Sequence, residues 1–277
     1  MTLRPVTLRP IDPDNPVTEP SRTHLVVRRL TDAAQLRALL HREPVNPVDD
    51  LDDPGAVEQA LGVRTGSDRR VFGLVHPEHP ERVRTVVWVA LTHGVPDSLV
   101  PLTDGAPSSA AGPDVDSADT AVFWSIWNDD RTVEGVGRGG DLIEGAAELL
   151  RAEHPGLSTM VTLSPAPGLR DWANAPERVE AAPDPLDHAA VATAAARYLT
   201  ARDERGRPID PVARFHLGNG ARLWRVVPDA DPSPRGRSRS FGLLVNYRYE
   251  PEDRAANRAA LDAGRISLGD QVRELLG

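Results

Sequence analysis

Two segments of the sequence carry side chains that could do acid–base or nucleophilic chemistry. Ser164 stands between an apolar run and Pro165, and His216 is followed closely by the turn formers Gly218-Asn-Gly220. Glycine and asparagine tolerate positive φ and disfavour a continuing helix. We therefore expect Ser164 and His216 at loop edges, where a hydroxyl and an imidazole can face a cleft. Such a pair could act as nucleophile and base.

The serine–histidine pair also has plainer interpretations. The sequence has no Gly-x-Ser-x-Gly elbow, and no carboxylate can be assigned to orient the imidazole, so a serine hydrolase is not favoured. His216 could be satisfied by nearby backbone, and Ser164 could cap a turn at a strand end. Residue types and spacing alone leave these structural roles open.

A third segment suggests a phosphate site. Gly135-Val-Gly137-Arg138-Gly139-Gly140-Asp141 precedes residues 142–151, whose apolar positions recur at helical spacing. A phosphate can bind free backbone N–H groups where a glycine-rich turn enters a helix, and Arg138 adds a cation. The segment is neither a P-loop nor a dinucleotide fingerprint, and a plain tight turn remains an equal alternative.

These segments need a framework of strands and helices to position them. Apolar, β-branched runs predict strands at residues 25–30, 70–75, 85–91, 121–127, 157–163 and 241–247. Helices are expected after Thr31, over residues 142–151, within 184–200 and around 268–276. The interspersed order indicates an α/β or α+β fold. His76 and His79 lie between two of the strands, where a solvated hairpin turn is favoured over a metal site.

Composition limits the function further. The chain has 277 residues, no cysteine and a net charge of −9, which argue against a nucleic-acid partner, disulfides and thiolate chemistry. Nothing resembles a signal peptide or a membrane-spanning run, so we expect a cytoplasmic globular protein without a membrane partner. Residues 1–22 read as a disordered tail, and residues 103–120 as a mobile insertion.

Six motifs resemble the catalytic domain of the malonyl-CoA decarboxylase family, in family order from about Leu25 to Leu276. They are Arg69-Arg-Val-Phe-Gly-Leu-Val-His76-Pro, Val89-Ala-Leu-Thr92, Phe123-Trp-Ser125-Ile, Leu163-Ser164-Pro-Ala-Pro-Gly168, Ala213-Arg-Phe-His216-Leu-Gly-Asn-Gly-Ala221 and Leu244-Val-Asn246-Tyr247. The Leu-Ser-Pro and Phe-His-Leu motifs together are specific to this family.

The resemblance implies a GNAT-like (acetyltransferase-like) fold over residues 23–277, with a central mixed sheet flanked by helices. It implies that Ser164 and His216 are catalytic. It also implies that CoA binds at Val136, Gly137, Arg138, Gly139 and Gly140, and that substrate contacts come from Ser125, Asn219, Asn246 and Tyr247. No metal or organic cofactor is expected, because the thioester is itself the electron sink.

The activity implied by the resemblance is decarboxylation of malonyl-CoA or methylmalonyl-CoA, through an enolate that a protonated His216 reprotonates. Two alternatives stay open: decarboxylation coupled to acyl transfer onto an acyl carrier protein, and a non-catalytic acyl-CoA-binding module. Two departures bear on these. Only residues 1–22 precede the matching region, so the family's N-terminal helical domain and its assembly are not expected. Trp127 stands where relatives have a second serine.

Overall fold

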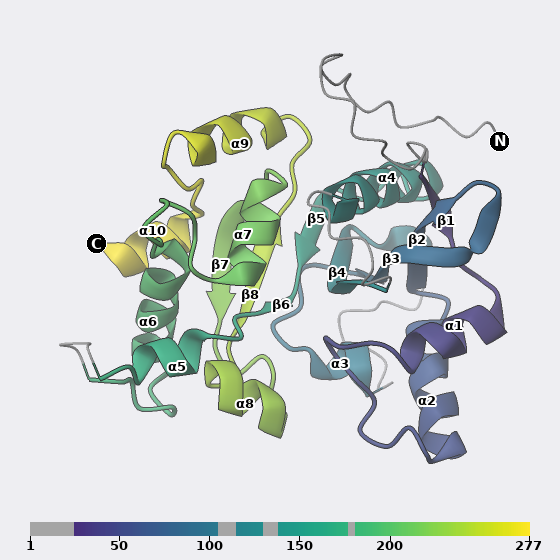
Figure 1. Cartoon of the computed structure of the whole chain (residues 1–277), viewed down its shortest axis with the longest axis horizontal. Coiled ribbons are helices and arrows are strands. Elements are labelled where there is room, and N and C mark those ends of the chain that lie inside the picture. Colours follow the sequence, from purple (N-terminus) through teal and green to yellow (C-terminus); the bar gives the residue numbers. More distant parts are fainter. Residues whose placement is uncertain (1–24, 105–114, 130–137, 177–180) are drawn as a thin grey trace, which may run out of the picture.

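The computed structural model of the protein describes residues 25–104, 115–129, 138–176 and 181–277 (Figure 1). The strands are β1 (Val26–Arg29), β2 (Arg69–His76), β3 (His79–Thr92), β4 (Thr120–Asn128), β5 (Thr159–Thr162), β6 (Ser164–Pro165), β7 (Arg222–Val227) and β8 (Leu244–Arg248). The helices are α1 (Ala33–Leu40), α2 (Pro54–Arg64), α3 (Val100–Thr103), α4 (Arg138–Glu153), α5 (Leu169–Ala173), α6 (His188–Thr200), α7 (Pro211–Gly218), α8 (Pro234–Ser240), α9 (Arg254–Asp262) and α10 (Asp270–Leu276), with a 3₁₀ turn at Val115–Ser117.

The strands form one mixed sheet. Its order is β1-β2-β3-β4-β5-β8-β6, and β7 also pairs with β8. All neighbours are antiparallel except β4 and β5, which run parallel. α4 provides the crossover between the parallel pair, as such a connection requires.

Helices cover both faces of the sheet (Figure 1). α4 packs on one face of β1–β4 through Leu142, Ile143 and Ala146, and α1 and α2 supply Leu39 and Leu61 to the core on the other side. A third apolar cluster joins β7 and β8 to α5, α6, α7 and α10. The expectation of a central mixed sheet flanked by helices is confirmed.

The sheet opens at the middle of β4. Trp88 on β3 faces Ser125, whereas the next residue, Val89, faces Phe123, so Trp124 is an extra residue that forms a bulge. β4 and β5 pair only as far as Phe123 and Thr162, and the chain then leaves β5 to pair with β8 as β6. The second half of β4 therefore lacks a parallel neighbour, and a cavity lies beside it.

Several expectations about individual elements need correction. His216 is not at a loop edge: it lies in the last turn of α7, because Gly218 is still helical and the first positive φ comes at Gly220 (85°). Ser164 is likewise not beyond the sheet, since Ser164 and Pro165 still pair with β8. Asp32, not Thr31, caps α1. The helix after the glycine-rich segment begins at Arg138 instead of Leu142.

Some expectations fall outside the described ranges. Residues 1–22 lie there, as do residues 105–114 of the expected insertion at 103–120. Among the helices that the structure does describe, none is long and apolar enough to span a membrane.

Candidate active site

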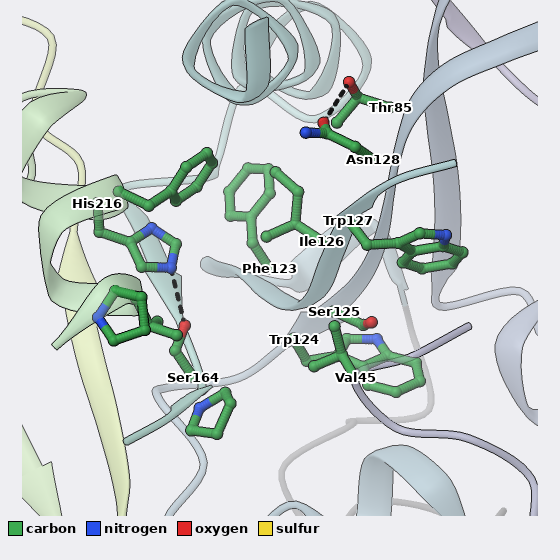
Figure 2. A pocket seen from close by; sticks show the side chains of 14 residues that line it. Val45, Thr85, Phe123, Trp124, Ser125, Ile126, Trp127, Asn128, Ser164 and His216 are labelled. Atoms are coloured by element: carbon green, nitrogen blue, oxygen red, sulfur yellow. Dashed lines mark hydrogen bonds between the residues drawn. The ribbon is translucent and has the colours of Figure 1, made fainter. Parts of the chain in front are cut away.

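A cavity of about 260 Å³ lies where β4 and β6 part. One wall comes from β6 and α7 and the other from β4 and the chain before α2, as Figure 2 shows. The lining residues are Val45, Thr85, Phe123, Trp124, Ser125, Ile126, Trp127, Asn128, Ser164, Pro165, Pro211, Val212, Phe215 and His216. Most are apolar and a few are polar, which is the usual make-up of a small-molecule site.

The structure brings Ser164 and His216 together on one wall. The Ser164 Oγ lies 3.1 Å from the His216 Nε2, within hydrogen-bond distance (Figure 2). Both side chains are buried, and His216 is only 1% exposed. A buried hydroxyl and a buried imidazole are thus in contact in the lining of the cavity.

α7 has a well-defined start that fixes the position of His216. The Asp210 carboxylate caps the helix by accepting from the Ala213 N–H at 2.7 Å, and Pro211 occupies the first turn, where it needs no N–H partner. Asp210 also accepts from the Tyr198 hydroxyl at 2.9 Å. Burial raises the pKa of Asp210, against the opposing effect of these hydrogen bonds.

The same tyrosine reaches the Ser164 side of the site. A Cβ on Gly168, four residues after Ser164, would collide with the Tyr198 hydroxyl, so only glycine allows this approach. Tyr198 therefore touches both the turn after β6 and the N-terminus of α7. These contacts fix the position of β6, which carries Ser164, relative to α7, which carries His216.

The second ring nitrogen of His216 has a partner that the sequence did not suggest. The His216 Nδ1 lies 2.8 Å from the hydroxyl of Tyr249, just beyond β8. Tyr247 stacks on the imidazole with ring centroids 4.5 Å apart. Residues two apart on a strand share a face, so Tyr249 could have been found from the Asn246-Tyr247 motif by that spacing.

Burial lowers the pKa of His216 to about 3, from an ordinary value of 6.5. The imidazole is therefore neutral at physiological pH, and the imidazolium expected from the sequence is not its resting form. Burial also raises the pKa of Tyr249, so its hydroxyl keeps its proton.

A neutral imidazole between two hydroxyls has two tautomers. If Tyr249 donates to Nδ1, Nε2–H donates to Ser164, whose own O–H is then free for a bound molecule. In the other tautomer, Nδ1–H donates to Tyr249 and Nε2 accepts from Ser164, which activates the serine as a nucleophile. The first makes Ser164 a hydrogen-bond donor and the second makes it a base-assisted nucleophile.

The opposite wall is backed by a buried ion pair. The Arg64 Nε lies 3.2 Å from the Glu43 Oε2, and both side chains are almost fully buried. Burial raises the pKa of Glu43, while Arg64 and the Ser125 hydroxyl oppose the rise. The Arg64 guanidinium stacks over the Trp124 ring at 5.1 Å. Ser125 thus lines the cavity with a charged pair behind it.

The other sequence-predicted substrate residues lie around the cavity, not in its described lining. Tyr247 packs behind His216. The Asn246 amide is used inside the sheet, where it donates to the Thr162 carbonyl at 2.6 Å and accepts from Arg225. Asn219 ends α7 and packs against Gly140, where a Cβ would collide with it.

The predicted CoA segment is described only in part. Val136 and Gly137 lie outside the described residues, and Arg138, Gly139 and Gly140 form the first turn of α4. Arg254 lies close by: it donates to the Asn219 carbonyl at 3.1 Å and pairs with Glu144 on α4. The start of α4, the end of α7 and the start of α9 therefore meet next to the cavity.

Comparison with known proteins identifies the family. Residues 24–189 and 177–277 match the model of the malonyl-CoA decarboxylase C-terminal domain. The chain belongs to this family. It is 29% identical over 280 residues to the mitochondrial malonyl-CoA decarboxylase of Anser anser anser, a match that covers 86% of this chain and 54% of the relative. The chain therefore spans about half the length of the curated relatives it matches.

Solved structures agree with this membership. The malonyl-CoA decarboxylase of Rhodopseudomonas palustris is 36% identical, with a TM-score of 0.75 over 90% of this chain and 66% of that one. The GNAT-like decarboxylase GphF, solved in complex with isobutyryl-CoA, is 19% identical. Its TM-score is 0.51 over 80% of this chain and 97% of that one, which shows the GNAT-like fold alone.

Proposed function

We propose that this chain decarboxylates malonyl-CoA to acetyl-CoA and CO₂ through an enolate of the thioester. The proposal rests on the contact between Ser164 Oγ and His216 Nε2 at the cavity wall. The chain's membership of the malonyl-CoA decarboxylase family supports it. The cavity is small and partly apolar, as suits the acyl end of a thioester. Methylmalonyl-CoA, with propionyl-CoA as its product, is the other substrate to be tested.

The reaction breaks one carbon–carbon bond and consumes one proton. The electron pair of the carboxylate–carbon bond moves into the thioester carbonyl as CO₂ leaves, which gives an enolate. A proton then adds to the former α-carbon and the carbonyl reforms. The electrons need no acceptor beyond the thioester, so we propose that the reaction uses no metal or organic cofactor.

Ser164 is proposed to stabilise the developing enolate oxygen. In the tautomer in which Tyr249 donates to His216, the Ser164 O–H is free to donate to the thioester oxygen. A hydrogen-bond donor already in place where charge develops is worth about 10²–10³-fold in rate, because it needs no reorganisation during the reaction.

His216 is proposed to supply the proton to carbon, directly or through Ser164. Because burial holds the imidazole neutral, we propose that its second proton is taken up when the substrate binds. The malonyl carboxylate would be a nearby negative charge in a buried site, and such a charge favours the protonated imidazole. We therefore expect substrate binding to be coupled to proton uptake.

The CoA moiety is proposed to extend from the cavity towards the start of α4. Backbone N–H groups at Arg138, Gly139 and Gly140 would face its pyrophosphate, as at other helix N-termini. Gly137 and Val136 are proposed to extend this contact. Ser125 remains a proposed contact for the acyl group because it lines the cavity.

The proposal is tested by following products with mass spectrometry. Malonyl-CoA and methylmalonyl-CoA are supplied side by side, with and without a phosphopantetheinylated carrier protein. Wild type should release acetyl-CoA, and Ser164→Ala and His216→Ala should each release it at least about 10²-fold more slowly. The absence of both acetyl-CoA and acetylated carrier protein above background, or a His216→Ala rate equal to wild type, would refute decarboxylation at this site.

The same assay separates the two alternatives. An acetylated carrier protein that replaces acetyl-CoA as product would identify an acyltransferase. Binding of CoA esters without turnover, seen as a thermal shift, would identify a binding module.

A further inference from the structure

The wall opposite Ser164 contains a short segment from outside the sheet. We refer to residues 43–46 as the Glu43–Asn46 segment. Val45 is its member that lines the cavity, next to Trp124 and Ser125 of β4. Figure 2 shows these three side chains across the cavity from Ser164 and His216. Val45 therefore faces the space next to Ser164 and His216 in which the acyl group is proposed to bind.

Hydrogen bonds fix the segment on both sides of Val45. The Pro44 carbonyl accepts from the Arg235 guanidinium at 2.6 Å. The Asn46 side chain donates to the Trp124 carbonyl at 3.1 Å, and the Asn46 carbonyl accepts from Arg64 at 2.8 Å. The chain on either side of Val45 is thus held by hydrogen bonds to α2, α8 and β4.

The charged groups of Glu43 and Arg64 behind this wall are not in the described lining of the cavity. Glu43 and Arg64 pair with each other, and Arg64 lies over the rings of Trp88 and Trp124. What Val45 adds to the lining is a branched apolar group, which is stiff about χ1. A rigid apolar wall discriminates by shape, because it cannot yield to an extra carbon without straining the segment.

We propose that Val45 sets the size of the acyl group accepted at this site, so that malonyl thioesters are preferred over those with an alkyl branch at the reacting carbon. The proposal rests on the proposed function for the identity of the acyl group. Discrimination of one methyl or methylene by an apolar pocket is worth about 10- to 200-fold in kcat/KM. This range is large enough to decide the substrate.

The direct test compares kcat/KM for malonyl-CoA and methylmalonyl-CoA in wild type, Val45→Ala and Val45→Ile. Val45→Ala should raise the methylmalonyl-to-malonyl ratio about tenfold or more, and Val45→Ile should lower it. Val48→Ala is the matched control. Val48 is a half-buried valine that packs against the same core cluster but is not in the described lining of the cavity. Ratios within twofold of wild type for both Val45 variants would overturn the proposal.

A binding measurement keeps this result separate from the proposed function. Dissociation constants for acetyl-CoA and propionyl-CoA report the same wall without any chemistry. If wild type turns over neither thioester, the proposed function fails, yet Val45→Ala should still improve relative propionyl-CoA binding. An unchanged binding ratio would overturn the size-selection proposal itself.

The role of the hydrogen bonds is tested by Arg235→Met, which keeps the aliphatic stem and removes the bond to Pro44. Loss of one such bond should loosen the wall and relax the substrate ratio about threefold in the direction of Val45→Ala. A ratio equal to wild type, with an unchanged melting temperature, would show that the segment is not held in this way.

Discussion

The two walls of the cavity are built in opposite ways. On the β6 and α7 wall, Ser164 and His216 present polar atoms to the cavity and are backed by aromatic rings. On the β4 wall, the charges of Glu43 and Arg64 are buried behind Val45 and Trp124. The β6 and α7 wall holds groups that can exchange a proton, and we call it the reactive wall. The β4 wall holds a fixed shape, and we call it the shaping wall.

The burial of charge explains this difference. Within the described ranges, the buried His216 imidazole has hydroxyl partners and no carboxylate in hydrogen-bond contact. It therefore stays neutral and can change its charge when a ligand arrives. The negative charge of Glu43 is already compensated by Arg64, so neither residue needs to change its charge when a ligand binds. Chemistry is therefore expected on one wall and selection on the other, and mutations should separate the two.

The largest expected effect is on the reactive wall. His216→Gln should lower kcat for malonyl-CoA about 10³-fold, because it removes the group that delivers the proton. The folded structure should be retained, which circular dichroism and the melting temperature can check. A residual activity above one tenth of wild type would remove the chemical distinction between the walls.

The next effect is on the shaping wall, and it concerns stability. Glu43→Ala leaves Arg64 buried without its partner and should lower the free energy of unfolding by about 3–5 kcal/mol. Urea denaturation measures it. The double variant Glu43→Leu with Arg64→Met should recover most of the loss, since it leaves no unpaired charge. If the single variant costs less than about 1 kcal/mol, the ion pair does not support this wall.

A pH effect should belong to the reactive wall. The pKa of His216 is about 3 in the folded protein, below its ordinary 6.5, so the unfolded chain binds a proton that the folded protein does not. The free energy of unfolding should therefore fall as pH drops below 6.5. Between pH 6.5 and 5 the contribution is about 2 kcal/mol.

The control for this pH effect is His216→Gln, which has no titrating group at that position. Chemical denaturation at pH 7 and pH 5 should show a larger loss for wild type than for the variant. Equal losses in the two proteins would mean that His216 is not held neutral by burial.

The smallest effect tests how His216 is oriented. Tyr249→Phe removes the hydroxyl at Nδ1 and should lower kcat about tenfold, the value of one lost hydrogen bond. The pH dependence of kcat should also shift, which a purely structural role would not cause. Tyr198→Phe is the structural comparison, because the Tyr198 hydroxyl supports α7 through Asp210 without touching the imidazole. It can lower kcat but should leave the pH profile of wild type unchanged. Identical rates and pH profiles for Tyr249→Phe and wild type would exclude Tyr249 as a positioning residue.

The sequence predicts the reactive wall better than the shaping wall. The strands around Phe72, Val87 and Phe123 were recognisable because β-branched and apolar residues run together there. Ser164 and His216 stood out through motifs that are local in sequence. The sequence does not indicate the helix that carries His216, because Gly218 resembles a helix stop. The structure shows that this glycine instead closes the last turn of α7.

The shaping wall had no comparable signal. Glu43, Arg64 and Ser125 come from three separate elements, and no spacing relates residues that only tertiary packing brings together. α2 itself was predictable, since Asp53-Pro54 is a cap followed by a proline in the first turn. The sequence could therefore have predicted the helix, but not that Arg64 turns inward beneath Trp124.

The central claim is that Ser164 and His216 decarboxylate malonyl-CoA to acetyl-CoA through an enolate that is protonated at carbon. Turnover in D₂O tests it most directly, with mass spectrometry of the product and acetyl-CoA incubated alone as the exchange control. Wild type should give acetyl-CoA with one solvent deuterium in the acetyl group, and His216→Gln should give almost none in the same time. No acetyl-CoA from wild type, acetyl-CoA without deuterium, or equal labelled product from His216→Gln would contradict the claim.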